Sequence, residues 1–298
     1  MILIKLDRKF YLVLFIILGM VFAFAFAFAF AFAFARTSEV VCLMVTGKDP
    51  CRILFARQAV HNFREQDYGP KRLVIVNHGA ESVLPASASA PAVADGQGDV
   101  VEFRVEKTQN ALTLGDLRNI ARALVPPGAI WTTWDDDDYR APRYLTTMIR
   151  EMGSADMLAW TRRTEFNANT GLVWGMELST GFNALIFARQ DMRLLYSRRD
   201  TMEDTHLIEA ARRLGKRVTV YRNDPAIYVR TVHANNTSLY VDKYKTGVPL
   251  RKKNTYSEFA LDAATSAATR TFMSSYFKQG LECYLSESKA TDSSAPPG

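Results

Sequence analysis

The sequence predicts an α/β domain with a doubly wound, mixed but mainly parallel sheet, preceded by a single transmembrane helix. Two observations predict the domain: short apolar runs of strand length alternate with stretches of helical periodicity, and polar residues follow several of the runs. Such alternation is typical of parallel sheets with helices on both faces. A third observation, an uncharged apolar run near the N-terminus, predicts the membrane helix.

Residues 10–35 form the predicted membrane helix. They carry no charge, and as a helix they would span about 39 Å, more than the roughly 30 Å hydrocarbon core of a bilayer. Lys5, Arg8 and Lys9 precede the run, whereas only Arg36 follows closely. The positive-inside bias therefore places residues 1–9 in the cytosol and the domain across the membrane, as in a type II signal-anchor protein. In a eukaryote that side is the ER or Golgi lumen.

The alternative for this segment is a cleaved signal peptide. Ala33-Phe34-Ala35 fits the small-residue pattern of a cleavage site. The apolar run is longer than the usual signal-peptide core of roughly 7 to 15 residues, which favours the uncleaved anchor.

Composition restricts the kind of partner. Residues 36–285 are long enough for one domain, and 48% hydrophobic with 23% charged residues is ordinary globular composition. The net charge of +6 is scattered over pairs such as Arg162-Arg163 and Arg212-Arg213, without the basic stripe of a nucleic-acid-binding protein. We therefore expect no nucleic-acid partner.

The first half of the domain is expected to hold four strands, at residues 40–45, 73–76, 100–105 and 129–134. Helices are expected at residues 53–63, from Leu114 after a capping box at Thr113, and from Pro142 to Gly153. The low-complexity stretch 84–98 has no periodicity and is expected to be a surface loop. In such sheets ligands bind beyond the carboxyl ends of the strands.

The second half is less regular. Strand-like stretches occur at residues 156–160, 171–178 and 184–188, followed by a helix at 203–214 and a strand at 218–221. These elements are expected to extend the sheet as a mixed sheet. The last residues, 286–298, are small and polar and are expected to be disordered.

Three cysteines, Cys42, Cys51 and Cys283, are too few for a disulfide framework or a zinc site. If the domain is lumenal, Cys51 and Cys283 are the favoured pair. The reason is that Cys42 lies in an apolar run expected to be a buried strand.

Four adjacent carboxylates, Asp135 to Asp138, follow the strand at 129–134. They repel one another, so their presence requires a cation or hydrogen-bond donors. A hard divalent cation takes carboxylate oxygens together with substrate phosphate oxygens, so the run indicates Mn²⁺ or Mg²⁺ with a diphosphate. On charge alone, an acidic turn that caps the next helix explains the run about equally well.

The context of the run favours the metal site. Residues 135–142, Asp-Asp-Asp-Asp-Tyr-Arg-Ala-Pro, resemble the D-x-D-D-x-x-x-P segment of family 2 glycosyltransferases, where an apolar strand also precedes the run and a helix follows. The resemblance extends over roughly residues 38–240. It implies a GT-A fold and inverting transfer of a sugar from a nucleotide-sugar, with a UDP-sugar favoured, in the presence of a metal ion.

By this resemblance the acidic run forms the donor and metal site. Asp135 and Asp137 correspond to the D-x-D pair, with Asp137 the principal metal ligand. Asp135 is expected to contact both the metal and the donor, and Asp136 the donor.

Two other segments extend the resemblance on the donor side. Residues 42–46 are similar to the family's first strand and donor loop, which makes Thr46 a donor contact. Residues 114–119, Leu-Gly-Asp-Leu-Arg-Asn, are similar to its A-R-N helix, which makes Arg118 another.

Glu203-Asp204 resembles the family's E-D motif at the start of a helix. In the family that aspartate lies on the acceptor side as the catalytic base, so the resemblance implies that Asp204 is the base and Glu203 an acceptor contact. Residues 201–204, Thr-Met-Glu-Asp, also fit a capping box, in which Asp204 only caps the helix. Both roles stay open.

The chain departs from the family after its second strand. Family members commonly carry Asp-Asp-Gly-Ser there, with an aspartate that contacts the nucleotide base, whereas this chain has Asn77-His78-Gly79-Ala80. Gly79 keeps the turn, and the Asn77 amide can still hydrogen-bond to the donor.

Two more residues are candidates. His233 follows an apolar strand, and many GT-A enzymes bring a histidine from this part of the chain to the metal or diphosphate. The alternatives are a structural histidine, or a glycosylated loop, since Asn235 and Asn236 head sequons. Among the four tryptophans, only Trp174 is expected to stack on the acceptor, because buried packing is the commoner role.

Two other functions share part of the pattern. A nucleotidyltransferase of the same fold would carry a glycine-rich basic loop after the first strand, and residues 46–50 are too short for it. A membrane-tethered carbohydrate-binding pseudoenzyme would lack the D-x-D or the base, and both are present. We therefore expect a metal-dependent glycosyltransferase that acts on a glycan or another hydroxyl acceptor.

Overall fold

The computed structural model describes residues 38–47, 49–84, 99–105, 112–190, 194–200, 203–233, 256–283 and 286. The predicted membrane helix, most of the 84–98 loop, both sequons and residues 287–298 of the tail lie outside these ranges. Residues 39–298 group into one unit, to which the following description applies. No helix in the described ranges has the length and apolarity needed to cross a bilayer.

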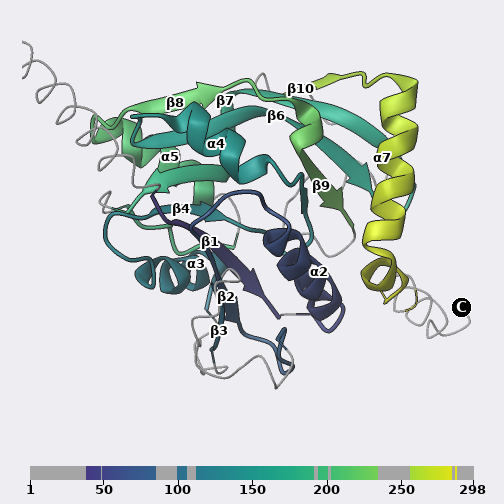
Figure 1. Ribbon diagram of the computed structural model, residues 1–298, viewed down its shortest axis with the longest axis horizontal. Coiled ribbons are helices and arrows are strands. Elements are labelled where there is room, and N and C mark those ends of the chain that lie inside the picture. Colours follow the sequence, from purple (N-terminus) through teal and green to yellow (C-terminus); the bar gives the residue numbers. More distant parts are fainter. Residues whose placement is uncertain are drawn as a thin grey trace, which may run out of the picture. The chain divides into compact units, whose positions relative to one another are not determined.

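The described strands form one mixed sheet in the order β3-β2-β1-β4-β7-β6-β9-β5, with β10 beside β7 and β8 beside β6 (Figure 1). Its strands are β1 (Val40–Thr46), β2 (Lys71–Asn77), β3 (Asp99–Arg104), β4 (Ile130–Thr133), β5 (Tyr139–Arg140), β6 (Met157–Asn167), β7 (Val173–Arg189), β8 (Val218–Tyr221), β9 (Tyr228–Val232) and β10 (Tyr256–Phe259). Among these pairings five are parallel and four antiparallel. The arrangement fits the predicted GT-A type.

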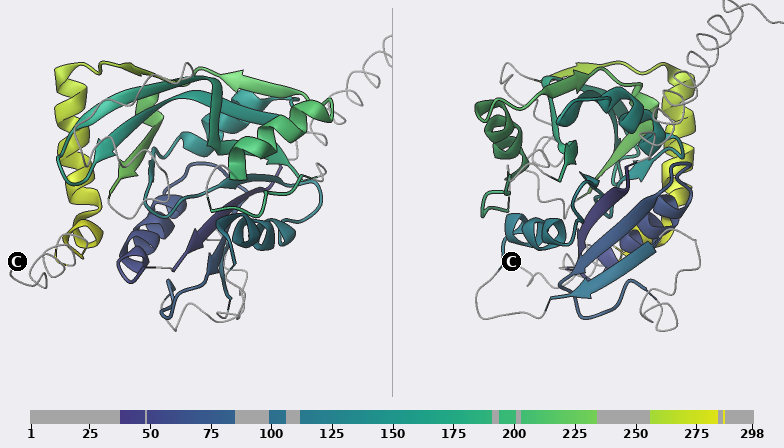
Figure 2. Two further views of the ribbon diagram at one scale, coloured as in Figure 1. Left: turned by 180° about the vertical axis from the view of Figure 1, so that it is seen from behind. Right: turned by 60° about the vertical axis from the view of Figure 1, so that its left-hand side comes forward.

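The helices cover both faces of the sheet. They are α2 (Arg52–Arg64), α3 (Leu114–Ala123), α4 (Tyr144–Met152), α5 (Glu203–Arg213) and α7 (Ala263–Tyr276), with a 3-10 turn, η2 (Pro225–Ile227), before β9. Figure 2 shows α2 and α3 on opposite sides of β1 and β2. The doubly wound prediction is confirmed for this part of the chain.

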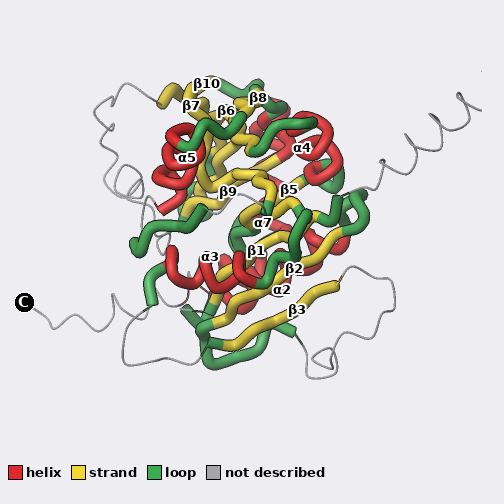
Figure 3. Tube along the Cα trace, turned by 90° about the vertical axis from the view of Figure 1, so that its left-hand side faces the viewer, coloured by secondary structure: helices red, strands yellow, loops and turns green. Residues whose placement is uncertain are grey.

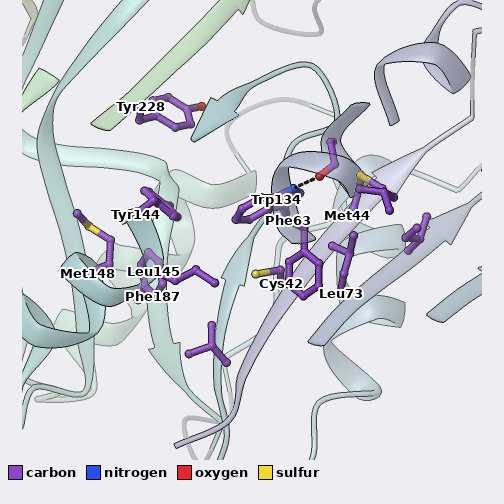
Figure 4. Packing of buried hydrophobic residues seen from close by; sticks show 14 of the residues in the cluster. Cys42, Met44, Phe63, Leu73, Trp134, Tyr144, Leu145, Met148, Phe187 and Tyr228 are labelled. Atoms are coloured by element: carbon purple, nitrogen blue, oxygen red, sulfur yellow. Dashed lines mark hydrogen bonds between the residues drawn. The ribbon is translucent and has the colours of Figure 1, made fainter. Parts of the chain in front are cut away.

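Alternation along β1 and β2 explains the two faces. Val40, Cys42 and Met44 of β1 belong to the core cluster that includes α2 and α4. Val41 and Leu43 belong to the second cluster, which includes α3 and α5. Successive side chains of a strand point to opposite faces, so an unbroken apolar run is what a strand covered on both sides requires. Figure 4 shows part of the first cluster.

The acidic run follows β4, which is one of four neighbouring parallel strands in the order β3-β2-β1-β4. Thr46 at the end of β1 is paired with Asn77 at the end of β2, and Leu43 is paired with Thr133 at the end of β4. In Figure 3, β1, β2 and β3 lie side by side, and β5 lies beside β9 in the other half. The carboxyl ends of β1, β2 and β4 therefore meet at one edge, as predicted.

The second half differs from the expectation. The expected strands at 156–160, 171–178 and 184–188 are parts of two long antiparallel strands, β6 and β7. The sequence hides residues 161–167 of β6 because all of them except Phe166 are charged or polar. Their charges are paired within the sheet, as Arg162 with Glu177 and Arg163 with Glu165.

Two local predictions have opposite outcomes. The capping box of α3 is confirmed, because the Thr113 hydroxyl accepts from the Asp116 amide and the Asp116 carboxylate accepts from the Thr113 amide. The helical periodicity after Thr113 also predicts Leu124 on the core face, and this is wrong, because Leu124 is 36% exposed. The helix ends at Ala123, and Val125 in the following turn enters the core instead.

Helix α7 was not predicted, and it closes the domain beside β6 and β7 (Figure 1). Met273 and Phe277 pack on Phe55 of α2 and Phe166 of β6 in a third core cluster. The predicted disulfide between Cys51 and Cys283 is present, and Cys42 is a buried free cysteine. The disulfide joins the start of α2 to the C-terminal segment.

Candidate active site

The acidic run begins at a fixed point of the core. Trp134 is fully buried, its amide donates to the Leu43 carbonyl at 2.8 Å, and its indole N–H donates to the Ala59 carbonyl of α2 at 3.2 Å (Figure 4). Its ring is packed edge-on against Phe63. The carboxylates that follow are therefore held against both β1 and α2.

Asp136 and Asp137 share one cation, Arg52, the first residue of α2. A single guanidinium nitrogen of Arg52 bonds to Asp136 Oδ1 and lies 3.1 Å from Asp137 Oδ2. The other oxygen of Asp136 accepts from the Thr46 hydroxyl at 2.6 Å. Thr46, predicted as a donor contact, thus lies directly beside the acidic run.

His233 also reaches the run. Its Nε2 lies 2.9 Å from Asp137 Oδ2, although the two residues are 96 positions apart, and its ring is stacked on Phe55 at 5.6 Å. Burial alone would raise the pKa of Asp137, but Arg52 and His233 outweigh it and hold that pKa below its usual range. The structure therefore brings together Asp137 and His233, two of the three predicted metal ligands; the carboxylate of the third, Asp135, is paired with Arg118 instead.

The neighbouring carboxyl titrates differently. Burial raises the pKa of Asp136 to about 6; Arg52 lowers it, and the adjacent Asp137 raises it again. The shared guanidinium of Arg52 and the Thr46 hydroxyl compensate part of the repulsion that the sequence implies.

Asp138 joins the run to the second half of the domain. The Tyr228 hydroxyl donates to Asp138 Oδ2, and the Thr231 amide donates to Oδ1 at 3.0 Å. Burial, followed by the charges of Asp137 and Asp135, raises the pKa of Asp138 to about 8. This carboxyl therefore joins β9 to the acidic run.

A buried arginine, Arg140, packs beside the acidic run. Arg140 is fully buried, and its guanidinium lies 4.3 Å from the Trp134 ring centroid and 5.2 Å from that of Tyr228. It also donates to the Asp135 carbonyl at 3.3 Å. The aromatic rings and the carbonyl compensate for the buried charge.

Asp135 points away from Asp137 toward α3 and α5. Arg118 of α3 lies 3.1 Å from Asp135 and also bonds to Glu203 at the start of α5. Asp204, which follows Glu203, is half-buried, and its charge contributes to the raised pKa of Arg118. The structure thus joins the predicted donor residues Asp135 and Arg118 to the predicted acceptor residues Glu203 and Asp204.

Glu203 is mostly protonated in this setting at mildly acidic pH. Burial raises its pKa to about 7, Arg118 lowers it, and Asp204 raises it again. A helix N-terminus favours negative charge, so the first turn of α5 is a stable place for both side chains.

Asn77 serves its own loop. Its amide nitrogen donates to Glu102 Oε1 at 2.7 Å and to the Glu81 carbonyl, and its oxygen accepts from the Gly79 amide at 2.8 Å. A Cβ on Gly79 would collide with Gly47 of the first loop, so glycine is required at this close approach. The predicted donor contact of Asn77 would require these bonds to be exchanged.

The tryptophans follow the common pattern. Trp131, Trp134 and Trp160 are fully buried and pack in the core, as expected. Trp174 of β7 is partly buried against the first core cluster, opposite Glu165 of β6. Its predicted role as an acceptor platform stays a prediction.

A buried charged cluster beside the acidic run was not predicted. Glu165 of β6 is bonded to Arg163 at 2.6 Å and lies 3.5 Å from Arg230 of β9, and all three are largely buried. Glu165, then Asp138, raises the pKa of Arg230. Charged residues at alternate positions of a strand are usually solvent-exposed, so only the pairing of β6 with β9 identifies them.

Arg52 was also missed, although one signal was available. No acidic residue lies in the first turn of α2, and a cation there is unfavourable to the helix macrodipole. An arginine at such a position indicates an acidic partner elsewhere in the chain, which is here the acidic run.

The residues present fit a divalent cation. Arg52 already places a positive charge between Asp136 and Asp137, and a carboxylate with an imidazole suits Mn²⁺. Within the described ranges no three His, Cys, Asp or Glu side chains are grouped so that they alone could hold a metal ion. A cation at Asp137 would therefore take further oxygen ligands from a substrate phosphate or water, as Mg²⁺ sites often do.

No family model and no curated protein sequence matches the chain. Among solved structures, Staphylococcus aureus TarS 1–349 in complex with UDP is 15% identical with a TM-score of 0.48, over 65% of this chain and 60% of that chain. The mannosyltransferase PcManGT from Pyrobaculum calidifontis in complex with GDP-Man and Mn²⁺ is 12% identical with a TM-score of 0.48, over 88% and 77%.

Proteins of similar arrangement thus include a glycosyltransferase. With TM-scores of 0.48, these likenesses decide neither the activity nor the substrate of this chain.

Proposed function

We propose that the chain is a metal-dependent glycosyltransferase that moves a sugar from a nucleotide-sugar, with a UDP-sugar favoured, to a hydroxyl group of a glycan or similar acceptor, with inversion. The supporting observation is Arg118, which bonds on one side to Asp135 of the acidic run and on the other to Glu203 of the Glu-Asp pair. A donor site and an acceptor base side by side are what direct transfer requires.

On the donor side, Thr46, Asp135 and Asp136 would bind and orient the nucleotide-sugar. Asp137 and His233, which lie 2.9 Å apart, would hold Mn²⁺ or Mg²⁺. When bound, the cation would neutralise charge on the leaving diphosphate. Arg118, beside Asp135, and Asn77, once its loop bonds are exchanged, would be the other donor contacts.

On the acceptor side, Asp204 would take the proton of the attacking hydroxyl while the oxygen bonds to the anomeric carbon and the bond to the diphosphate oxygen breaks. Glu203 and Trp174 would contact the acceptor. Arg118, which carries a full charge next to Glu203, would keep Asp204 within reach of the donor side.

The test is a screen of nucleotide-sugars on the purified full-length chain. We expect at least one to raise the melting temperature in the presence of Mn²⁺ and to be hydrolysed slowly to its nucleoside diphosphate. If no nucleotide-sugar stabilises the chain and none is hydrolysed by it, with or without Mn²⁺, the proposal is contradicted.

We further propose that residues 10–35 anchor the chain as a type II membrane protein, with the domain in the ER or Golgi lumen if the source is a eukaryote. The support is the uncharged run with its basic flank. Protease added to intact microsomes should spare the domain. Digestion without detergent would show the opposite orientation.

A further inference from the structure

Arg52 is placed at the centre of the candidate site without belonging to any of its motifs. Its side chain is 17% exposed, whereas those of Asp136 and Asp137 are 2% and 6% exposed. It thus covers the two carboxylates from the solvent side. Any cation that reaches them must pass or replace this guanidinium.

Arg52 and a bound cation would contact the same atom, Asp137 Oδ2. Asp137 Oδ2 is 3.1 Å from Arg52 and 2.9 Å from His233, so a cation between Asp137 and His233 would lie close to the guanidinium nitrogen. Two positive charges at that separation repel strongly in a buried site. Arg52 and a metal ion therefore exclude each other at Asp137.

The residues on either side of Arg52 are fixed in the fold, so a displacement of the guanidinium would involve the Arg52 side chain. The preceding residue, Cys51, is fully buried and is bonded to Cys283, and its amide donates to Asp49 Oδ1 at 2.8 Å. The next residue, Ile53, is in the core. A displaced guanidinium must therefore remain within one side-chain length of the acidic run.

The surroundings favour an anion as its second partner. The first turn of α2 has no acidic residue, so the helix N-terminus contributes positive potential beside Arg52. The planar fork of a guanidinium matches phosphate oxygens with two hydrogen bonds. A diphosphate bound to a cation on Asp137 would lie within the same side-chain length.

We propose that Arg52 exchanges between two partners: it holds Asp136 and Asp137 when no metal is present, and it binds the diphosphate of the donor when a divalent cation takes Asp137. This inference rests on the proposed function for the identity of the donor. Arg52 is then a competitor of the metal and a ligand of the nucleotide. The first role weakens the binding of the metal and the second strengthens the binding of the nucleotide, so one substitution at Arg52 can separate them.

The test is titration calorimetry on the full-length chain and its Arg52→Met variant, which keeps the apolar length and removes the charge. The control is Arg57→Met, which removes an exposed positive charge from the same helix. Each protein is titrated with MnCl₂ alone, and then with UDP and with GDP, both without Mn²⁺ and at saturating Mn²⁺.

We expect Arg52→Met to bind Mn²⁺ roughly tenfold more tightly and the nucleoside diphosphate roughly tenfold more weakly, the typical effect of one hydrogen bond to a charged group. Arg57→Met should match the wild type in both. An Mn²⁺ affinity of Arg52→Met that is equal to or weaker than wild type would overturn the competition. An unchanged nucleotide affinity would overturn the exchange.

If Arg52→Met does not fold, Arg52→Lys serves instead. It keeps the charge but has a shorter reach and no fork, so both affinities should change in the same directions by smaller factors. No change in either would overturn the proposal.

Failure of the exchange is distinguishable from failure of the proposed function. One outcome is that the wild type binds nucleoside diphosphate equally with and without Mn²⁺ while Arg52→Met loses binding in both conditions. That outcome would mean that Arg52 replaces the metal, and the proposal of sugar transfer would stand. Conversely, the opposite shifts in a protein that turns over no nucleotide-sugar would support the exchange and contradict the glycosyl transfer.

Discussion

The parallel half of the domain and its antiparallel extension bury different kinds of side chains. Along β1 and β2 the buried side chains are apolar until the last position, where Thr46 and Asn77 stand at the edge of the sheet. Along β6 and β9, charged residues such as Glu165 and Arg230 are buried within the strands. In β1 and β2 buried polar side chains are thus confined to the carboxyl ends, whereas β6 and β9 carry charged side chains within the strands.

The difference teaches how the acidic run is tolerated. All four carboxylates come from the first half, but two of them are compensated by residues from the second half. Asp137 is next to His233, and Asp138 is bonded to Tyr228 and the Thr231 amide. The site is therefore formed by residues from both halves. Substituting these residues one at a time should separate their effects on ligand binding, on catalysis and on the stability of the fold.

The largest effect is expected from Asp137→Asn, which removes the carboxylate charge from the proposed metal site. The amide keeps the shape of the carboxylate but not its charge, so Mn²⁺-dependent binding of nucleoside diphosphate should disappear while the fold is retained. Calorimetry with UDP or GDP measures it. Glu151→Gln, an exposed change on α4, is the control. Retained metal-dependent binding in Asp137→Asn would disprove the metal assignment.

The next effect concerns Asp204, where a catalytic base and a helix cap respond differently. Asn can still accept a hydrogen bond at the helix start, but it cannot take a proton. If Asp204 is the base, Asp204→Asn should lower the transfer rate by roughly 10² to 10⁴-fold while donor binding persists. Transfer rate and melting temperature are measured on the same preparation. Near-normal turnover with a lowered melting temperature would favour the cap.

A third change compares buried with exposed charge in the same pair of strands. Glu165→Gln leaves two buried guanidiniums without their shared carboxylate, and we expect it to destabilise the domain by about 3 kcal/mol. Glu177→Gln removes the partner of Arg162 and Arg222, which are more exposed, and should cost about 0 to 1 kcal/mol. Urea unfolding measures both. Equal costs would mean that β6 is not buried as described.

The smallest effect lies in the first half, at the loop that Asn77 supports. Burial alone would raise the pKa of Glu102, but hydrogen bonds from Asn77, the Leu84 amide and Ser82 outweigh it, so the pKa lies below 4.5. A depressed carboxyl pKa stabilises the fold above the unfolded value, and this contribution is lost as pH falls through the folded value.

Glu102→Gln should therefore lower the stability at pH 7 by about 1 kcal/mol, a small value because the carboxylate is half-exposed and screened. The difference from wild type should shrink as pH falls below about 4.5, where both side chains are neutral. Melting temperatures between pH 7 and pH 3.5 test this. A difference that does not depend on pH would show that the charge of Glu102 is not what stabilises the loop.

Much of the first half was predictable because its signals are local. The apolar run of β1 and the capping box of α3 each lie within a few residues of the chain, and both are confirmed. The length of β6 was not predictable. Apart from Phe166, its residues 161–167 are charged or polar, and only pairing with β7 and β9 turns them into a buried strand.

The sequence by itself determined the acidic run, its place after a buried strand and the presence of the Glu-Asp pair, because these are neighbours along the chain. Only the tertiary structure decided which cation faces which carboxylate: Arg52 on Asp136 and Asp137, and Arg118 between Asp135 and Glu203. Those partners are 17 to 85 residues apart. Electrostatic pairing depends on distance in space, which strand register and helix packing set and which no spacing in the sequence records.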